Sequence, residues 1–404
     1  MAQRVRARSQ HNAENLLMPV QRTLRVKPAN GKRVVLGDLG NKSTISQAAS
    51  EVPTSNVCKE KPKPSLAKVK KKCNQPQNTE VQENVIVKQV KEKPLQLQRF
   101  PTSMEVMGRL PSENLCPTFS QMLLNIEDID AGDVHDTHLC CEYVKDVYSY
   151  LREIEKKGAV KPMYLEGSPI TGNMRTILIE WLVQVHSRFQ MLQETLYLTV
   201  GIIDRFLQAH PVHKSKLQLV GVTAMLIASK YEEIFSPRIA DFSYITDHSC
   251  TRAQIREMER CILQVLNFNL SFPIALHFLR RVAKVGDAST QLYALAKYLS
   301  ELSLIDYDMV HYPASQVSAA AFALALKVLD FGEWTSTLQH YTGYTEDHLM
   351  SAMKHLANNV LRVNEGMTKH TIIKTKYASP GHMKISTIPH LKSDSVRTLS
   401  ESLS

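Results

Sequence analysis

Charged side chains within apolar stretches are the strongest candidates for chemistry in this 404-residue sequence. Arg175 and Asp204 lie in apolar runs with helical spacing, where an unpaired charge would be strongly unfavourable. We therefore predict that these two side chains pair with each other. Lys230 and Glu259 lie at the polar edges of apolar stretches. Each could bind backbone groups of a partner across an interface, or the two could form an ordinary exposed salt bridge.

Glu232 and Glu233 are adjacent carboxylates that could suggest acid–base catalysis. Neighbouring residues on a helix point about 100° apart, so these two would not converge on one substrate atom. A solvated or partner-facing charge is the better interpretation. The sequence also has no Gly-rich phosphate loop, His-Arg-Asp string or nucleophile elbow. We therefore predict a non-catalytic protein that holds no metal and no cofactor of its own.

The cysteines show no Cys-x-x-Cys pair, and their odd number favours reduced thiols over a disulfide framework or a metal site. The amino terminus is polar and Arg-rich, unlike a secretory leader. The longest apolar stretches, 217–228 and 319–326, are shorter than the ~18 residues of a membrane span. These features predict a soluble intracellular protein that does not bind membranes.

The positions of the apolar residues predict an all-α fold. Apolar residues recur at helical spacing in about five segments after a cap at 172–173, with breaks near 193–194, 210–211, 236–237 and 247–251. A second set covers 276–285, 291–304, 314–329 and 348–363. Thr251 followed by Gln254 has the pattern of a capping box. No segment alternates as a strand would, so two helical bundles of ~100 residues each are predicted.

The charge is distributed unevenly along the chain. Residues 1–100 hold 20 of the 49 Lys and Arg but 7 of the 39 Asp and Glu, so the net charge of +10 comes from this segment. Its polar composition cannot bury enough surface to offset backbone ordering. We predict a disordered basic region at 1–109, a more acidic and apolar segment at 110–142, bundles at 143–271 and 272–390, and a flexible tail at 391–404.

Several phrases resemble the cyclin box in the order that cyclins show. They begin with Met174–Phe189 and continue with 196–207, 216–220 and 224–234. The resemblance covers roughly residues 140 to 390 and is to mitotic B-type cyclins, nearer the first vertebrate subtype than the second. It implies two tandem cyclin folds after a long disordered amino-terminal region. It also implies a regulatory subunit that binds and activates the mitotic cyclin-dependent kinase at the G2/M transition, with ATP and Mg²⁺ bound by the kinase.

The resemblance implies that Arg175 and Asp204 form a buried ion pair with a structural role inside the first fold. It also assigns two sets of contact residues. Lys230 and Glu259 correspond to positions that hold the kinase, with apolar and aromatic neighbours adding buried area; the predicted set is Tyr143, Tyr150, Lys230, Tyr231, Glu233, Ile234, Phe235 and Glu259. The second set corresponds to a patch that recognises Arg-x-Leu peptides in substrates. Its residues are expected to be partly exposed, with Trp181 as a rigid floor; they are Met174, Ile177, Leu178, Trp181, Gln184 and Gln218. Such a stripe could otherwise be core.

Regulatory motifs precede the predicted bundles. Arg33, Leu36 and Asn41 match the destruction box that the anaphase-promoting ubiquitin ligase reads, with Lys42, Lys59, Lys61 and Lys63 as possible ubiquitin acceptors. An export-like spacing occurs in Leu115, Phe119, Met122 and Leu124, which could bind nuclear transport receptors or pack on the fold. The resemblance implies a cytoplasmic location in interphase, and nuclear, centrosomal and spindle locations in mitosis.

Two other functions fit a pair of cyclin folds. One is a transcription factor that clamps DNA, but the net charge beyond residue 100 is slightly negative and no Cys-x-x-Cys ribbon precedes the folds. We therefore expect no direct nucleic-acid binding. The other is a scaffold that binds a kinase without activating it, which only an activity assay can distinguish from an activator.

Overall fold

The computed structural model describes residues 126 and 128–401, which belong to one structural unit. Helices and turns make up this part of the chain, and no strand occurs in it, as the all-α prediction requires. None of its helices has the length and apolarity needed to cross a membrane. The disordered region predicted at 1–109 lies outside the described residues.

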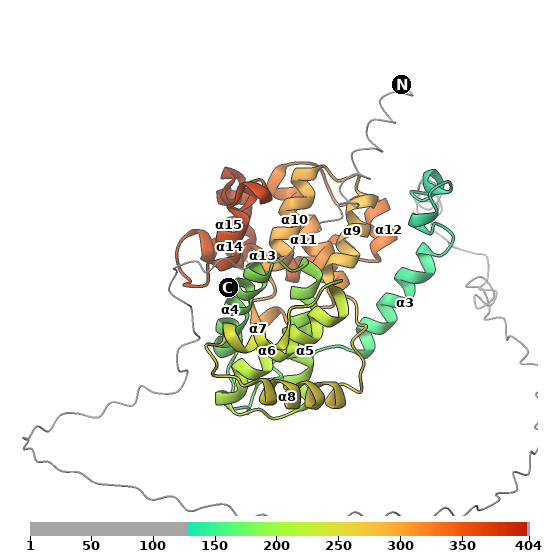
Figure 1. The fold of residues 1–404 in the computed structure, drawn as a ribbon. Helices are drawn as coiled ribbons and strands as arrows, with labels where there is room; N and C mark the ends of the chain where they lie inside the picture. The colour runs from blue at the N-terminus through green and yellow to red at the C-terminus, as the bar shows by residue number, and fades with distance from the viewer. Residues whose placement is uncertain (1–125, 127, 402–404) are drawn as a thin grey trace, which may run out of the picture. The chain divides into compact units, whose positions relative to one another are not determined.

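Five helices form the first bundle, drawn in green to yellow in Figure 1. At its centre is α6, which packs against α5, α4, α7 and α8. Small residues such as Gly221, Ala224 and Ala228 line α6 and let its neighbours approach closely. The five helices are α4 (Gly172–Phe189), α5 (Gln193–Ala209), α6 (Leu217–Glu232), α7 (Ile239–Ile245) and α8 (Arg252–Val265).

Side-chain caps fix where these helices begin. Thr251 accepts from the backbone N–H of Gln254, whose side chain accepts from Thr251 N, so the predicted capping box is confirmed. The cap of α4 was predicted at Gly172–Asn173, which is wrong by one residue. Thr171 is the N-cap, because its extended backbone lets Oγ1 accept from Met174 N at 3.3 Å.

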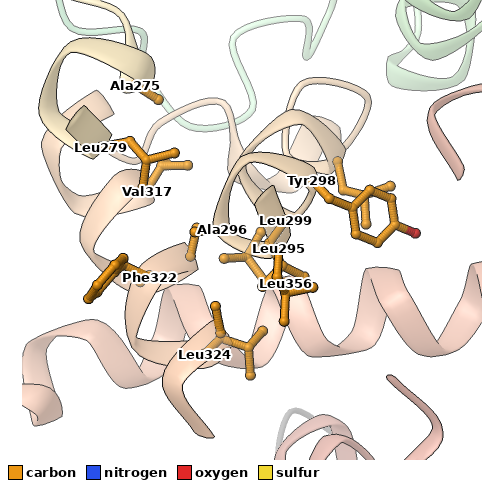
Figure 2. Packing of buried hydrophobic residues seen from close by; sticks show 14 of the residues in the cluster. Ala275, Leu279, Leu295, Ala296, Tyr298, Leu299, Val317, Phe322, Leu324 and Leu356 are labelled. Atoms are coloured by element: carbon orange, nitrogen blue, oxygen red, sulfur yellow. The ribbon is translucent and has the colours of Figure 1, made fainter. Parts of the chain in front are cut away.

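The second bundle is built around α11, whose alanines are almost all buried. Figure 2 shows Phe322 and Leu324 of α11 with Leu295 and Leu299 of α10 and Leu356 of α13, all within one apolar cluster. Five helices, drawn in orange to red in Figure 1, form this bundle. They are α9 (Ala275–Val285), α10 (Thr290–Leu302), α11 (Ala314–Leu329), α12 (Ser336–Thr342) and α13 (Glu346–Asn364).

The two bundles share an apolar junction. Ile179 and Val183 of α4 and Tyr197 of α5 belong to the same buried cluster as the second bundle. Phe272, in the connection between the bundles, packs against both clusters. Its ring lies against Gly201 so closely that a Cβ at this position would collide with it. The absence of a side chain at residue 201 therefore lets the connection pass close to α5.

The helix α3 (Val144–Lys157) precedes the first bundle in the sequence, and its side chains bind backbone groups of the second bundle. Tyr148 Oη donates to His277 O at 3.1 Å, and Arg152 Nη2 donates to Tyr341 O at 3.4 Å. Glu155 accepts from Ser315 N at 3.0 Å. These side chains reach backbone groups that are far away in the sequence, and the periodicity of the sequence cannot reveal such contacts.

The carboxyl-terminal segment is folded, so the prediction of a flexible tail at 391–404 is wrong for residues 391–401. Leu391 and Val396 are fully buried, and α15 (Asp394–Glu401) packs along α13. Between α13 and α15 the chain forms α14 (Ile372–Tyr377) and three short 3₁₀ turns. Residues 402–404 lie outside the described part.

Candidate partner-binding surface

Arg175 and Asp204 form the predicted ion pair inside the first bundle. Arg175 Nε donates to Asp204 Oδ1 at 2.6 Å and Nη2 donates to Oδ2 at 2.7 Å, and both side chains are buried. Tyr164 Oη also donates to Asp204, at 2.8 Å. Burial, together with this carboxylate, raises the pKa of Tyr164 well above its ordinary value, so the phenol keeps its proton. The pair is enclosed, which favours a role in stability over direct binding.

The end of α6 presents the most exposed apolar side chains of the first bundle. Ile234 is 90% exposed, Phe235 is 85% exposed and Tyr231 is half exposed. The helix stops at Glu232 because Glu233 adopts an extended conformation, and Pro237 follows shortly after. Large apolar side chains grouped on a surface commonly mark a protein-binding site.

A salt bridge lies beside this apolar group. Lys230 Nζ is 2.6 Å from Glu259 Oε1, linking α6 to α8. Lys230 is half exposed and Glu259 is mostly covered. A cleft of about 480 Å³ adjoins the pair. It is lined by Leu226, Lys230, Ser236, Pro237, Arg238, Ile239, Arg256 and Glu259. The surface therefore offers a paired cation and anion next to exposed aromatic and aliphatic groups.

Glu233, predicted as a kinase contact, is bound within the chain. Its Oε1 accepts from Leu192 N at 2.7 Å and from Thr195 Oγ1 at 2.6 Å. Leu192 is the N-cap of α5, so the carboxylate satisfies a free backbone donor where the helix dipole favours negative charge. This bond ties the end of α6 to the start of α5 and positions Ile234 and Phe235. Glu233 therefore has a positioning role within the chain, its predicted contact with a kinase stays a prediction, and a catalytic pairing with Glu232 has no geometric support.

Tyr143 and Tyr150 are exposed along α3, together with Val147. The three positions recur at steps of four and three residues, so they share one face. None of the residues of α3 is fully buried, and Tyr148 and Arg152 attach the helix by hydrogen bonds to the second bundle. This face is a second apolar surface available to a partner.

The predicted peptide-binding stripe on α4 is only partly at the surface. Met174, Ile177, Gln184 and Gln218 are half-buried, as expected. Leu178 and Trp181 are 0% and 3% exposed, so their predicted partial exposure is wrong. Gly221 of α6 explains the burial of Leu178, because without a Cβ it leaves room for the leucine side chain directly against the helix.

Gln218, at the start of α6, retains a free hydrogen-bond donor. Its Oε1 accepts from Ser249 Oγ at 3.2 Å, whereas its Nε2 has no hydrogen-bond partner among the described residues. An unpaired buried amide is unfavourable, and a peptide backbone carbonyl could satisfy it after a small rearrangement. The geometry therefore leaves Met174, Ile177, Gln184 and Gln218 as the accessible part of the stripe.

Sequence reasoning missed a second buried charge between the bundles. Glu301 of α10 is fully buried, and its carboxylate accepts from Lys376 Nζ at 2.6 Å and from Tyr377 Oη at 2.8 Å. Gln193, at the start of α5, donates to the same carboxylate. Glu301 carries the same signal as Arg175, namely a charge within an apolar helix.

Two groups of predicted site residues cannot be placed. The destruction-box residues Arg33, Leu36 and Asn41 lie outside the described residues. The same holds for the export-like residues Leu115, Phe119, Met122 and Leu124.

Comparisons with known proteins match this chain to cyclins along nearly its whole length. The family model of the cyclin N-terminal domain matches residues 146–271, and that of the cyclin C-terminal domain matches residues 273–391. The chain is 48% identical over 412 residues to the G2/mitotic-specific cyclin-B1 of Anguilla japonica, covering 100% of both. It is 50% identical over 376 residues to the G2/mitotic-specific cyclin-B2 of Gallus gallus, covering 92% of both.

Among solved structures, a viral cyclin from herpesvirus saimiri aligns with a TM-score of 0.47 at 19% sequence identity. The alignment covers 52% of this chain and 96% of the viral one.

Proposed function

This chain belongs to the B-type cyclins, and from that premise we propose that it is the activating subunit of a mitotic cyclin-dependent protein kinase. The observation that carries the proposal is the surface at the end of α6. There the exposed Tyr231, Ile234 and Phe235 adjoin the Lys230–Glu259 pair. The chain itself supplies no catalytic group in this proposal, and ATP and Mg²⁺ belong to the kinase.

Activation follows if this surface binds one kinase conformation better than the others. The α6–α8 surface is rigid, because Glu233 fastens the end of α6 and the salt bridge joins the two helices. Lys230 can donate to backbone carbonyls of the kinase and Glu259 can accept from its amides, and such charge-assisted bonds exceed neutral ones in strength. Moving a conformational equilibrium from 1:99 to 99:1 needs about 5.5 kcal/mol of differential affinity, within reach of a standard-sized interface.

The proposal is tested with the purified full-length chain, a monomeric cyclin-dependent kinase and a histone substrate. Lys230→Glu and Glu259→Lys should each lower kinase activation by about 10-fold or more, since each removes a bond worth about 1.5–3 kcal/mol. The double swap can rebuild the intrachain salt bridge but presents reversed charges to the kinase. It should therefore remain inactive while the fold is kept.

The matched control is the exposed pair between Lys327 and Glu346 on the second bundle. Swapping these two charges should leave activation unchanged. A fully active Lys230/Glu259 swap would show that this pair serves only the fold. Binding of the wild-type chain to the kinase without a rise in phosphotransfer would favour the scaffold function instead.

We also propose that the accessible part of the α4 stripe directs substrate choice by binding Arg-x-Leu peptides. Met174→Ala together with Gln218→Ala should weaken phosphorylation of an Arg-x-Leu substrate and spare that of a substrate without the motif. These two positions are preferable to Trp181, whose buried ring would also destabilise the bundle when removed. Equal phosphorylation of both substrates by the variant complex would refute the docking role.

Destruction and location remain proposals from the sequence. We propose that Arg33, Leu36 and Asn41 are read by the anaphase-promoting ubiquitin ligase, and that Arg33→Ala with Leu36→Ala prevents loss of the protein at mitotic exit. Loss on the normal schedule would contradict this. For the export-like residues, Phe119→Ala with Leu124→Ala should cause nuclear accumulation in interphase if transport receptors bind there.

A further inference from the structure

An acidic segment ahead of α3 lies bound to Arg281 and Lys284 of α9, which together with the rings of Tyr148 and Tyr341 we call the basic pocket. Asp130 is 4% exposed and Arg281 is 8% exposed, and the two meet in a bidentate pair. Arg281 Nη1 donates to Asp130 Oδ1 and Nη2 donates to Oδ2, each at 2.6 Å. Lys284, one turn later on α9, donates to the same Oδ1 at 2.8 Å. One carboxylate thus receives three charge-assisted bonds.

Aromatic rings complete the pocket around Arg281. The guanidinium lies over the ring of Tyr148 from α3 and the ring of Tyr341 from α12, with centroid distances of 5.5 and 5.2 Å. The hydroxyl of Tyr341 accepts from Ile129 N at 3.3 Å, so the pocket also binds the backbone of the segment. The hydrogen bond from Arg281, followed by that from Lys284, lowers the pKa of Asp130 to about 2. The carboxylate is therefore ionised at any physiological pH.

The flanking acids add to the match. Asp128 accepts from Lys145 Nζ at 3.1 Å, and Asp133 pairs with Lys284. The spacing of the acids in residues 128–133 therefore matches the cations that α3 and α9 present. Arg280, although adjacent to Arg281, points elsewhere and pairs with Glu194 of α5. The recognition thus depends on particular cations and not on the general charge of α9.

We propose that this pocket is a recognition site for acidic peptides, occupied in cis by residues 128–133, and that acidic segments of the same spacing compete for it in trans. A tethered ligand acts at an effective concentration in the millimolar range, so it suppresses a free competitor until the tethered segment is released. The site is separate from the end of α6, so peptide binding there does not depend on kinase activation.

The test uses the full-length chain and a fluorescein-labelled peptide with the sequence of residues 126–135. An opened chain carrying Asp130→Ala and Asp133→Ala should bind the peptide at least about tenfold more tightly than the wild-type chain, measured by fluorescence anisotropy. Adding Arg281→Gln to the opened chain should abolish the binding. Adding Arg280→Gln instead should preserve it, and circular dichroism would verify that both variants are folded.

The peptide with Asp130→Asn should bind the opened chain weakly, which provides a test without any change to the pocket. Equal binding to the wild-type and opened chains, or no binding to the opened chain, would overturn the proposal. So would equal losses with Arg280→Gln and Arg281→Gln, since general charge attraction would then explain the binding.

Discussion

At the residue scale, the buried charges of this chain are matched by partners of fixed geometry. Asp204 receives a guanidinium and a phenol, Glu301 receives an ammonium and a phenol, and Asp130 receives a guanidinium and an ammonium. Taking such groups out of water costs more than the pair returns unless the remaining lone pairs are also satisfied. Removing one member of the Asp204 or the Glu301 set should therefore be strongly destabilising, because each lies between packed helices.

Arg175→Ala leaves the Asp204 carboxylate buried without its cation, and we expect a loss of about 3–5 kcal/mol in the free energy of unfolding. Urea denaturation followed by circular dichroism measures it. As a control, Arg397→Ala removes the exposed partner of Glu365, 3.7 Å away, and should change stability by less than about 1 kcal/mol. An unchanged midpoint for Arg175→Ala would contradict the structural role of the pair.

His186 makes stability depend on pH. Its Nε2 is 2.7 Å from Leu192 O while Nδ1 is buried without a partner, and burial lowers the pKa of this imidazole below 6.5. Below pH 6.5 the unfolded chain therefore binds a proton that the folded chain does not. The free energy of unfolding should then fall by up to about 1.4 kcal/mol per pH unit for this group as the pH decreases.

Urea titrations at pH 7.5 and 5.5 measure this effect. His186→Gln keeps a side-chain donor for Leu192 but cannot titrate, so its loss of stability between the two pH values should be smaller. His277, whose pKa is also lowered by burial, should keep part of the dependence in this variant. An identical pH dependence in the wild-type chain and the His186→Gln variant would show that His186 does not cause the pH dependence of stability.

At the element scale, most helices could be predicted from the sequence, whereas the contacts between distant helices could not. Apolar periodicity gave the helices of the first bundle and, except for α12, those of the second to within a few residues, and a charge in an apolar run gave the Arg175–Asp204 pair. The sequence pattern did not predict the burial of Leu178, because that burial depends on Gly221, 43 positions later. It did not predict the positioning role of Glu233, because the partner of this carboxylate is a backbone amide. Contacts between distant segments leave little trace in local spacing.

The helix α15 illustrates a segment whose polar composition hides its packing. Val396 is fully buried although its neighbours Arg397 and Thr398 are exposed. Val396→Ala should cost about 1–2 kcal/mol in the free energy of unfolding, from lost burial and the cavity left behind. Thr398→Ala on the exposed face should change it by less than about 0.5 kcal/mol. Equal small effects in urea denaturation would mean that α15 adds nothing to stability.

At the scale of the whole molecule, the two bundles share one interface and should unfold together. Residues of α4 and α5 enter the cluster of the second bundle, and Arg175 Nη1 also donates to Leu304 O at 3.0 Å across the junction. His370, after α13, pairs with Glu180 of α4 at 2.5 Å. Neither bundle can therefore open without exposing apolar surface of the other.

The two tryptophans of the chain allow a direct test, since Trp181 lies in the first bundle and Trp334 lies in the second. In Trp181→Phe the fluorescence reports only the second bundle, and in Trp334→Phe only the first. Within each variant, urea denaturation followed by fluorescence should coincide with that followed by far-UV circular dichroism. Separate midpoints would show that the bundles unfold independently.

The attachment of α3 has a consequence for regulation at a distance. Tyr143 and Tyr150 are carried by a helix fastened to the second bundle, whereas Phe235 projects from the first. A kinase that contacts all three side chains would bridge the two bundles and stabilise the interface between them. Gly201→Val would displace Phe272 and loosen this interface. The affinity for the kinase should then fall, although every side chain that contacts the kinase is intact.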